Sequence, residues 1–162
     1  MRFAIRPIVS VVVCFGLSAV LVGPAQAQSD SQVGVWKLNL AKSKFSPGPA
    51  PKEATVTIEA AGPGRKVTVN GVAADGTPVK WGYSGNFDGK EIPLTGNNPD
   101  ADVVMLRRIS ANAVRTTNKK AGKRTLVNGV SVSPDGKTLT VAQQGVNAKG
   151  QTVKNLQVFD KQ

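Results

Sequence analysis

The chain has 162 residues and carries 21 lysines and arginines against 10 aspartates and glutamates, a formal net charge of +11. That length suits a single folded domain. Because histidine is absent and cysteine occurs once, the chain lacks the commonest general base and the usual nitrogen and sulfur ligands of zinc. We therefore expect no catalytic residues of the histidine-activated kind, no metal site and no cofactor.

Residues 1–27 predict a secretory signal peptide. Two arginines precede an apolar run over residues 8–22, and Ala25 and Ala27 are the small residues of a cleavage site. The run is shorter than the ~20 residues that a membrane-spanning helix needs. We expect cleavage after Ala27 and export to the periplasm or the extracellular space. The mature domain, residues 28–162, then contains no cysteine.

The mature chain alternates apolar and polar residues with a period of two, which is typical of antiparallel strands with one wet face. The alternating stretches lie at residues 55–59, 66–70, 79–84, 138–141 and 155–159. Three dipeptides, Asp75-Gly76, Asp88-Gly89 and Asp135-Gly136, each predict a hairpin turn, because both central positions of such a turn favour positive φ. The expected fold is an all-β, single antiparallel meander barrel of about 8–10 strands.

Other segments of the mature chain carry weaker signals. A short turn or helix is expected at residues 41–45, and the proline-rich residues 46–52 predict a stiff, extended connector. Residues 92–102 predict a long irregular loop, where binding residues often lie. Residues 71–80 resemble residues 145–154, which we interpret as two hairpins that share one turn chemistry rather than a duplicated half-barrel.

A basic cluster is the strongest charge feature. It comprises Arg107, Arg108, Arg115, Lys119, Lys120, Lys123 and Arg124. Turns at residues 110–113 and 121–122 would bring these cations onto neighbouring strands. Such a face attracts anionic partners, for example an anionic component of the cell envelope. The alternative is a solvated outer face whose lysines protect the sheet edges from aggregation. Since we expect export, nucleic acid is not an expected partner.

The few aromatic residues bear on where a ligand would lie. Trp81, Tyr83 and Phe87 share the same parity, so they would face one interior, either as ordinary core or as the lining of a ligand cavity. A membrane-spanning barrel needs girdles of aromatic residues, so we expect a protein that is not integral to the membrane.

Several short motifs carry a resemblance to known proteins. Gly34-Val35-Trp36 is similar to the Gly-x-Trp that begins lipocalin-type barrels. Together with Lys42-Ser43-x-Phe45, Phe87-Asp88-Gly89-Lys90 and residues 133–140, it resembles small exported bacterial proteins of unassigned function. The resemblance implies a lipocalin-like β-barrel in an envelope protein, with the tryptophan at the closed end, and it supplies no catalytic residues.

These observations favour an exported, monomeric, non-catalytic protein that holds a small apolar or amphipathic ligand inside the barrel. We expect Trp36 to close the floor, with Trp81, Tyr83 and Phe87 along the wall and Arg107 or Arg108 near the rim. The alternative is a cell-envelope interaction protein with a filled barrel and a basic face for anionic polymers or lipids. An enzyme that uses the carboxylates Asp100 and Asp102 is a third, less favoured hypothesis.

Overall fold

The computed structural model describes residues 30–162, so the signal peptide predicted at residues 1–27 lies outside the described residues. The described part contains eleven strands and one short 3-10 helix. In chain order these are β1 (Gly34–Leu38), η1 (Leu40–Lys42), β2 (Glu53–Ala61), β3 (Gly64–Val72), β4 (Pro78–Gly85), β5 (Asp88–Pro93), β6 (Thr95–Gly96), β7 (Val103–Ser110), β8 (Ala113–Lys120), β9 (Lys123–Val132), β10 (Thr138–Val146) and β11 (Thr152–Lys161).

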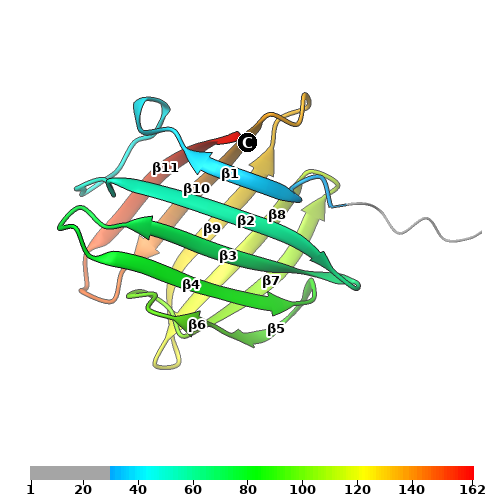
Figure 1. The fold of residues 1–162 in the computed structure, drawn as a ribbon. Helices are drawn as coiled ribbons and strands as arrows, with labels where there is room; N and C mark the ends of the chain where they lie inside the picture. The colour runs from blue at the N-terminus through cyan, green and yellow to red at the C-terminus, as the bar shows by residue number, and fades with distance from the viewer. Residues whose placement is uncertain (1–29) are drawn as a thin grey trace, which may run out of the picture.

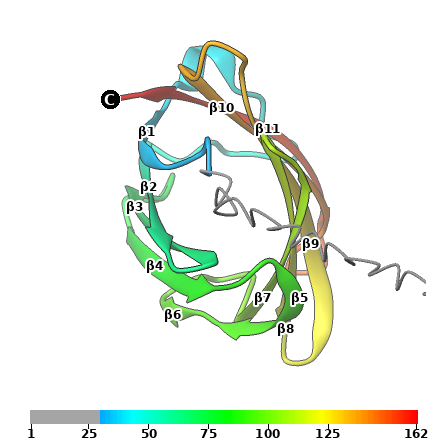
Figure 2. The same ribbon diagram turned by 90° about the vertical axis from the view of Figure 1, so that its right-hand side faces the viewer.

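The strands form one antiparallel sheet that curls into a nearly closed barrel (Figures 1 and 2). The order is β5-β7-β8-β9-β10-β11-β1-β2-β3-β4-β6, so neighbours in the sequence are mostly neighbours in the sheet. The first and last strands pair, with Trp36 opposite Lys161, and this pairing joins the two halves of the meander. The predicted all-β barrel is confirmed. It has one strand more than the upper end of the expected range of 8–10, and one of its strands, β6, has only two residues.

Alternation places the apolar side chains inside the barrel. On β3, Val67 is buried whereas its neighbour Lys66 is exposed, and the same inward parity continues on the adjacent strands. The most completely buried core side chains are Trp36 and Leu106, each with 0% of its surface exposed, and Leu139 and Val114, each with 1%. Burial of these side chains stabilises the barrel by about 1.5–3 kcal/mol each.

Two of the three predicted Asp-Gly hairpins are confirmed and one is wrong. The turns at Asp75-Gly76 and Asp135-Gly136 join β3 to β4 and β9 to β10. Asp88-Gly89 instead begins β5, which pairs with β7, while β4 pairs with β3 and β6. Gly89 has a φ of +78°, and a Cβ there would lie 2.8 Å from the guanidinium carbon of Arg107. A bulge against β7 therefore uses this glycine.

The two similar segments are hairpins with the same hydrogen bonds. In the β3–β4 turn, the Ala73 N–H donates to the Thr77 carbonyl at 2.9 Å. In the β10–β11 turn, the Asn147 N–H donates to the Gln151 carbonyl at 3.0 Å. The likeness in sequence therefore reflects one turn geometry used twice, as interpreted from the sequence.

The remaining connections differ in part from expectation. The short helix is one 3-10 turn, Leu40–Lys42, displaced slightly from the predicted range, and the Asn39 side chain caps it by accepting from the Lys42 N–H at 3.1 Å. The segment predicted as a long loop contains the end of β5 and all of β6, which pairs with β4. None of the helical structure in residues 30–162 is long and apolar enough to cross a membrane.

A candidate ligand cavity inside the barrel

A cavity of about 440 Å³ lies inside the barrel. It reaches from the barrel interior to the loops at one end, which we call the open end. These loops contribute Phe45, Pro49, Pro51, Ala73, Ala74, Asn98, Pro99 and Asp100 to the lining. Its volume falls within the ~300–1,000 Å³ typical of small-molecule sites. The barrel is therefore hollow, and the filled barrel of the alternative hypothesis is wrong.

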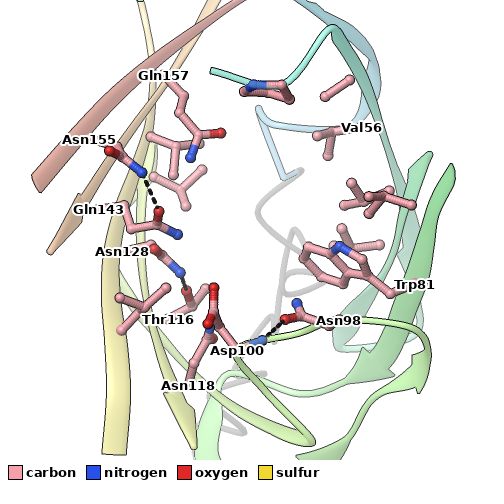
Figure 3. A pocket seen from close by; sticks show the side chains of 18 of the residues that line it. Val56, Trp81, Asn98, Asp100, Thr116, Asn118, Asn128, Gln143, Asn155 and Gln157 are labelled. Carbon is pink, nitrogen blue, oxygen red and sulfur yellow. Dashed lines mark hydrogen bonds between the residues drawn. The ribbon is translucent and has the colours of Figure 1, made fainter. Parts of the chain in front are cut away.

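One side of the cavity is apolar. Strands β2, β3 and β4 contribute Val56, Val69 and Trp81, whose side chains face inward because they share the inward parity of their strands. The register places Val69 opposite both Val56 and Trp81, so the three side chains form one continuous patch. Figure 3 shows Val56 and Trp81 together on one side of the cavity.

The other side carries uncharged polar groups, and we call it the amide wall. It comprises Thr116 and Asn118 on β8, Asn128 on β9, Gln143 on β10 and Asn155 and Gln157 on β11. Four of them stand in one row, because Thr116 is opposite Asn128, Asn128 opposite Gln143, and Gln143 opposite Asn155. Figure 3 shows this column of side chains facing Trp81 across the cavity.

Hydrogen bonds within the row fix the positions of its side chains. Asn128 Nδ2 donates to Thr116 Oγ1 at 2.8 Å, and Asn155 Nδ2 donates to Gln143 Oε1 at 2.9 Å. Asn155 Oδ1 in turn accepts from the Ser46 N–H at 3.0 Å, which attaches the proline-rich connector to the wall. The four side chains of this row are thus held in place before any ligand binds.

The opposite, closed end of the barrel is filled by the segment that precedes β1. The Gln32 side chain, with 0% of its surface exposed, donates to the carbonyls of Val130 at 3.1 Å and Asn112 at 3.2 Å. The indole N–H of Trp36 donates to the Gln32 carbonyl at 2.8 Å. These bonds attach the segment to β9 and to the β7–β8 turn, so they seal this end.

A buried arginine lies just above this seal. Arg65, 1% exposed, donates from Nη1 to Gln32 Oε1 at 2.6 Å and from Nη2 to Tyr83 Oη at 3.4 Å. Its guanidinium carbon lies 5.6 Å from the centre of the Phe87 ring, and that of Arg108 lies 4.0 Å from the same ring. Favourable cation–π contact and hydrogen bonding offset part of the cost of burying these charges.

The predicted site residues divide into two groups. Trp81 and Tyr83 line the cavity, whereas Trp36, Phe87, Arg107 and Arg108 are not among its lining residues. Trp36 is a core residue at the closed end, where the prediction put it. Phe87 follows the end of β4 and lies close to the guanidinium groups of Arg65 and Arg108.

The two arginines predicted near the rim lie elsewhere. Arg108 points inward at the closed end, where its Nη2 lies 3.8 Å from Asp30 Oδ2. Arg107 is exposed on the outer face of β7. Sequence parity distinguishes the two faces of β7, but the place of Arg108 at the closed end depends on its contacts with Asp30 and Phe87, which are distant in sequence.

Sequence reasoning missed the amide wall. A signal was present, since Asn128 interrupts the inward apolar series of Leu126 and Val130 on one strand, and Gln143 follows Val141 in the same way. An inward amide in a barrel strand indicates further polar groups in the interior, because a buried amide needs a hydrogen-bond partner.

The carboxylates considered for catalysis brace loops at the open end. Asp100 Oδ1 accepts from the Ala148 N–H at 3.0 Å, and Asp102 Oδ2 accepts from the Ala121 N–H at 2.8 Å. Within residues 30–162, no group of three or more acidic, cysteine or histidine side chains is arranged to hold a metal ion.

Comparison with known proteins supports the fold. No family model matches the chain, and no curated protein matches it in sequence. Among solved structures, the crystal structure of zebrafish ileal bile acid-binding protein in complex with cholic acid is similar, with a TM-score of 0.51 and 13% identity over 82% of this chain and 99% of the other. At this identity the similarity shows a shared barrel fold.

Proposed function

We propose that this protein is an exported binding protein that holds one small apolar or amphipathic molecule inside the barrel. The observation that carries the proposal is the cavity of about 440 Å³ with an apolar wall around Trp81. Desolvation of a ligand against Val56, Val69 and Trp81 contributes about 25 cal/mol per Å² of apolar surface removed from water. The similar barrel of a bile acid-binding protein supports this use of the fold.

A cavity-filling variant tests the proposal. Val69→Phe adds a ring beside Trp81 and occupies the cavity, so we expect at least about a tenfold loss of affinity for Nile red, an uncharged apolar dye. Asn70→Phe is the matched control, because Asn70, the neighbour of Val69, is exposed on the outer face of β3. Binding is measured by dye fluorescence on delipidated protein. Absence of dye binding, or equal effects of the two variants, contradicts the proposal.

Export rests on the predicted signal peptide. Expression of the full chain in a Gram-negative host should yield a product whose amino terminus is Gln28 in the periplasmic fraction. Ala27→Lys removes the small residue required for cleavage and should leave the leader attached. An intact amino terminus on the unmodified protein contradicts this part of the proposal.

A second candidate function is binding of an anionic envelope polymer or lipid surface by the basic face. The observation that favours it is the register, which places Arg107 directly opposite Arg115 on the neighbouring strand. Like charges directly opposite one another destabilise a sheet, so an external anion would relieve their repulsion.

Sedimentation with vesicles containing phosphatidylglycerol tests this second function. Binding should weaken steeply as salt rises, since exposed charges are screened within ~8 Å at physiological ionic strength. Replacing Arg107 and Arg115 by Gln should reduce binding, whereas binding that is insensitive to salt contradicts it.

A further inference from the structure

We infer that the ligand is a rigid molecule with one apolar face and one face that bears hydroxyl groups. The inference rests on the proposed function and specifies the chemistry of the same cavity. Its basis is the arrangement of the walls, since Val56 and Trp81 stand on one side and the amide wall stands on the other.

The amide wall keeps hydrogen-bonding capacity that the protein does not use. Gln143 accepts a bond from Asn155 through Oε1, and its Nε2 donates no hydrogen bond within residues 30–162. In the same part of the chain, the side-chain amides of Asn118 and Gln157 make no hydrogen bond, although Asn118 is only 8% exposed. Each amide offers both a donor and an acceptor, which is the complement of a hydroxyl group.

The amide wall itself carries no charge. The cation of the lining, Arg65, lies apart from it near the closed end, is 1% exposed, and donates to Gln32 and Tyr83 while its Nε has no hydrogen-bond partner in residues 30–162. A carboxylate or ammonium group placed against the amide wall would lose its hydration without gaining an opposite charge, which is costly. An uncharged hydroxyl loses less and is satisfied by an amide.

The two-sided arrangement also favours a rigid ligand. Donors and acceptors follow the register of β8 to β11, so they stand in a row rather than at one point. A molecule with a fixed ring system can present hydroxyls to this row and hydrocarbon to Trp81 at once. A flexible chain would have to order many bonds to do so, and that ordering reduces its affinity.

Two steroid probes test this inference, with affinities measured by displacement of Nile red. Methyl cholate has three hydroxyls and no charge, and methyl 5β-cholanate has neither hydroxyls nor charge. We expect methyl cholate to bind about tenfold more tightly, the factor of about one to two net hydrogen bonds to the amide wall.

Paired variants test the amide wall itself. Gln157→Met removes an unpaired amide and should lower the affinity for methyl cholate about fivefold, which is the factor of one net hydrogen bond. The affinity for methyl 5β-cholanate should not fall. Gln143→Met should act in the same direction. Gln144→Met is the matched control, since this neighbour on β10 is exposed outside the barrel, and it should change neither affinity.

The outcomes distinguish the inference from the proposed function. If Nile red binds but methyl cholate and methyl 5β-cholanate bind with equal affinities, the hydroxyl part of the inference is overturned and the proposed function stands. A Gln157→Met variant that weakens both uncharged steroids equally shows a general effect on the barrel and overturns the assignment to the amide wall. Failure of Nile red to bind overturns the proposed function.

Discussion

Two leucines provide a direct test that the barrel is hollow. Leu106 on β7 is 0% exposed and is not among the cavity-lining residues, so it is packed on all sides. Leu94, between β5 and β6, lines the cavity and is only partly buried. Leu→Ala at the two sites is the same chemical change in two environments, one closely packed and one that borders an existing space.

The expected losses of stability differ for a physical reason. At Leu106 the substitution removes the transfer free energy of a buried side chain and opens a new void, which together cost about 3–4 kcal/mol. At Leu94 about half of the side chain's transfer free energy is lost and the removed volume joins the existing cavity, so the cost is about 1 kcal/mol. The two variants should therefore differ by about 2 kcal/mol or more.

Urea unfolding followed by tryptophan fluorescence measures this difference. With a slope of about 2 kcal/mol per molar urea, the midpoints of the two variants should lie about 1 M apart, with Leu94→Ala the more stable. Nile red should still bind to Leu94→Ala, because the substitution enlarges the cavity. Equal midpoints would refute the reasoning, since they would mean that Leu94 is packed as closely as Leu106.

Two further predictions concern local structure. Hydrogen bonds from Asn39 and from the Lys42 ammonium lower the pKa of Asp160 below its ordinary 3.8. The protein should therefore be more stable than the Asp160→Asn variant above pH 3.8, and this difference should disappear as the pH falls through the lowered pKa. Urea midpoints between pH 2 and 6 will show the change. Gly96 has a φ of +89°, and a Cβ there would lie 2.1 Å from a carbonyl oxygen of β4. Gly122 has a similar φ of +75°, but a Cβ there would meet nothing within 4 Å. Gly96→Ala should therefore lower the melting temperature more than Gly122→Ala. Equal melting temperatures for these two variants, or a pH-independent difference for Asp160→Asn, would contradict the respective prediction.

Local patterns in the sequence were sufficient for the strands and for most turns. The alternation at Val67 and Val69, and at Trp81 and Tyr83, indicates which side chains face inward, because successive residues of a strand point to opposite faces whatever the strand pairs with. The same locality explains the confirmed Asp-Gly turns. It also explains the failure at Asp88-Gly89, where the pairing partner is β7 and not the preceding strand.

The site depended on contacts that no local pattern encodes. The row from Thr116 to Asn155 exists because the register of four strands aligns residues that are far apart in the sequence. Arg108 lies at the closed end because Asp30 and Phe87 meet it there, although the sequence placed it near the rim.

By itself, the sequence determined an all-β chain with an apolar inner face, because alternation is a property of each strand alone. Only the tertiary structure decided that the interior is hollow, that one wall is polar, and which end is open. These features follow from the number of strands and from their register. They also follow from the pairing of Trp36 with Lys161, which brings together two residues that are far apart in the sequence.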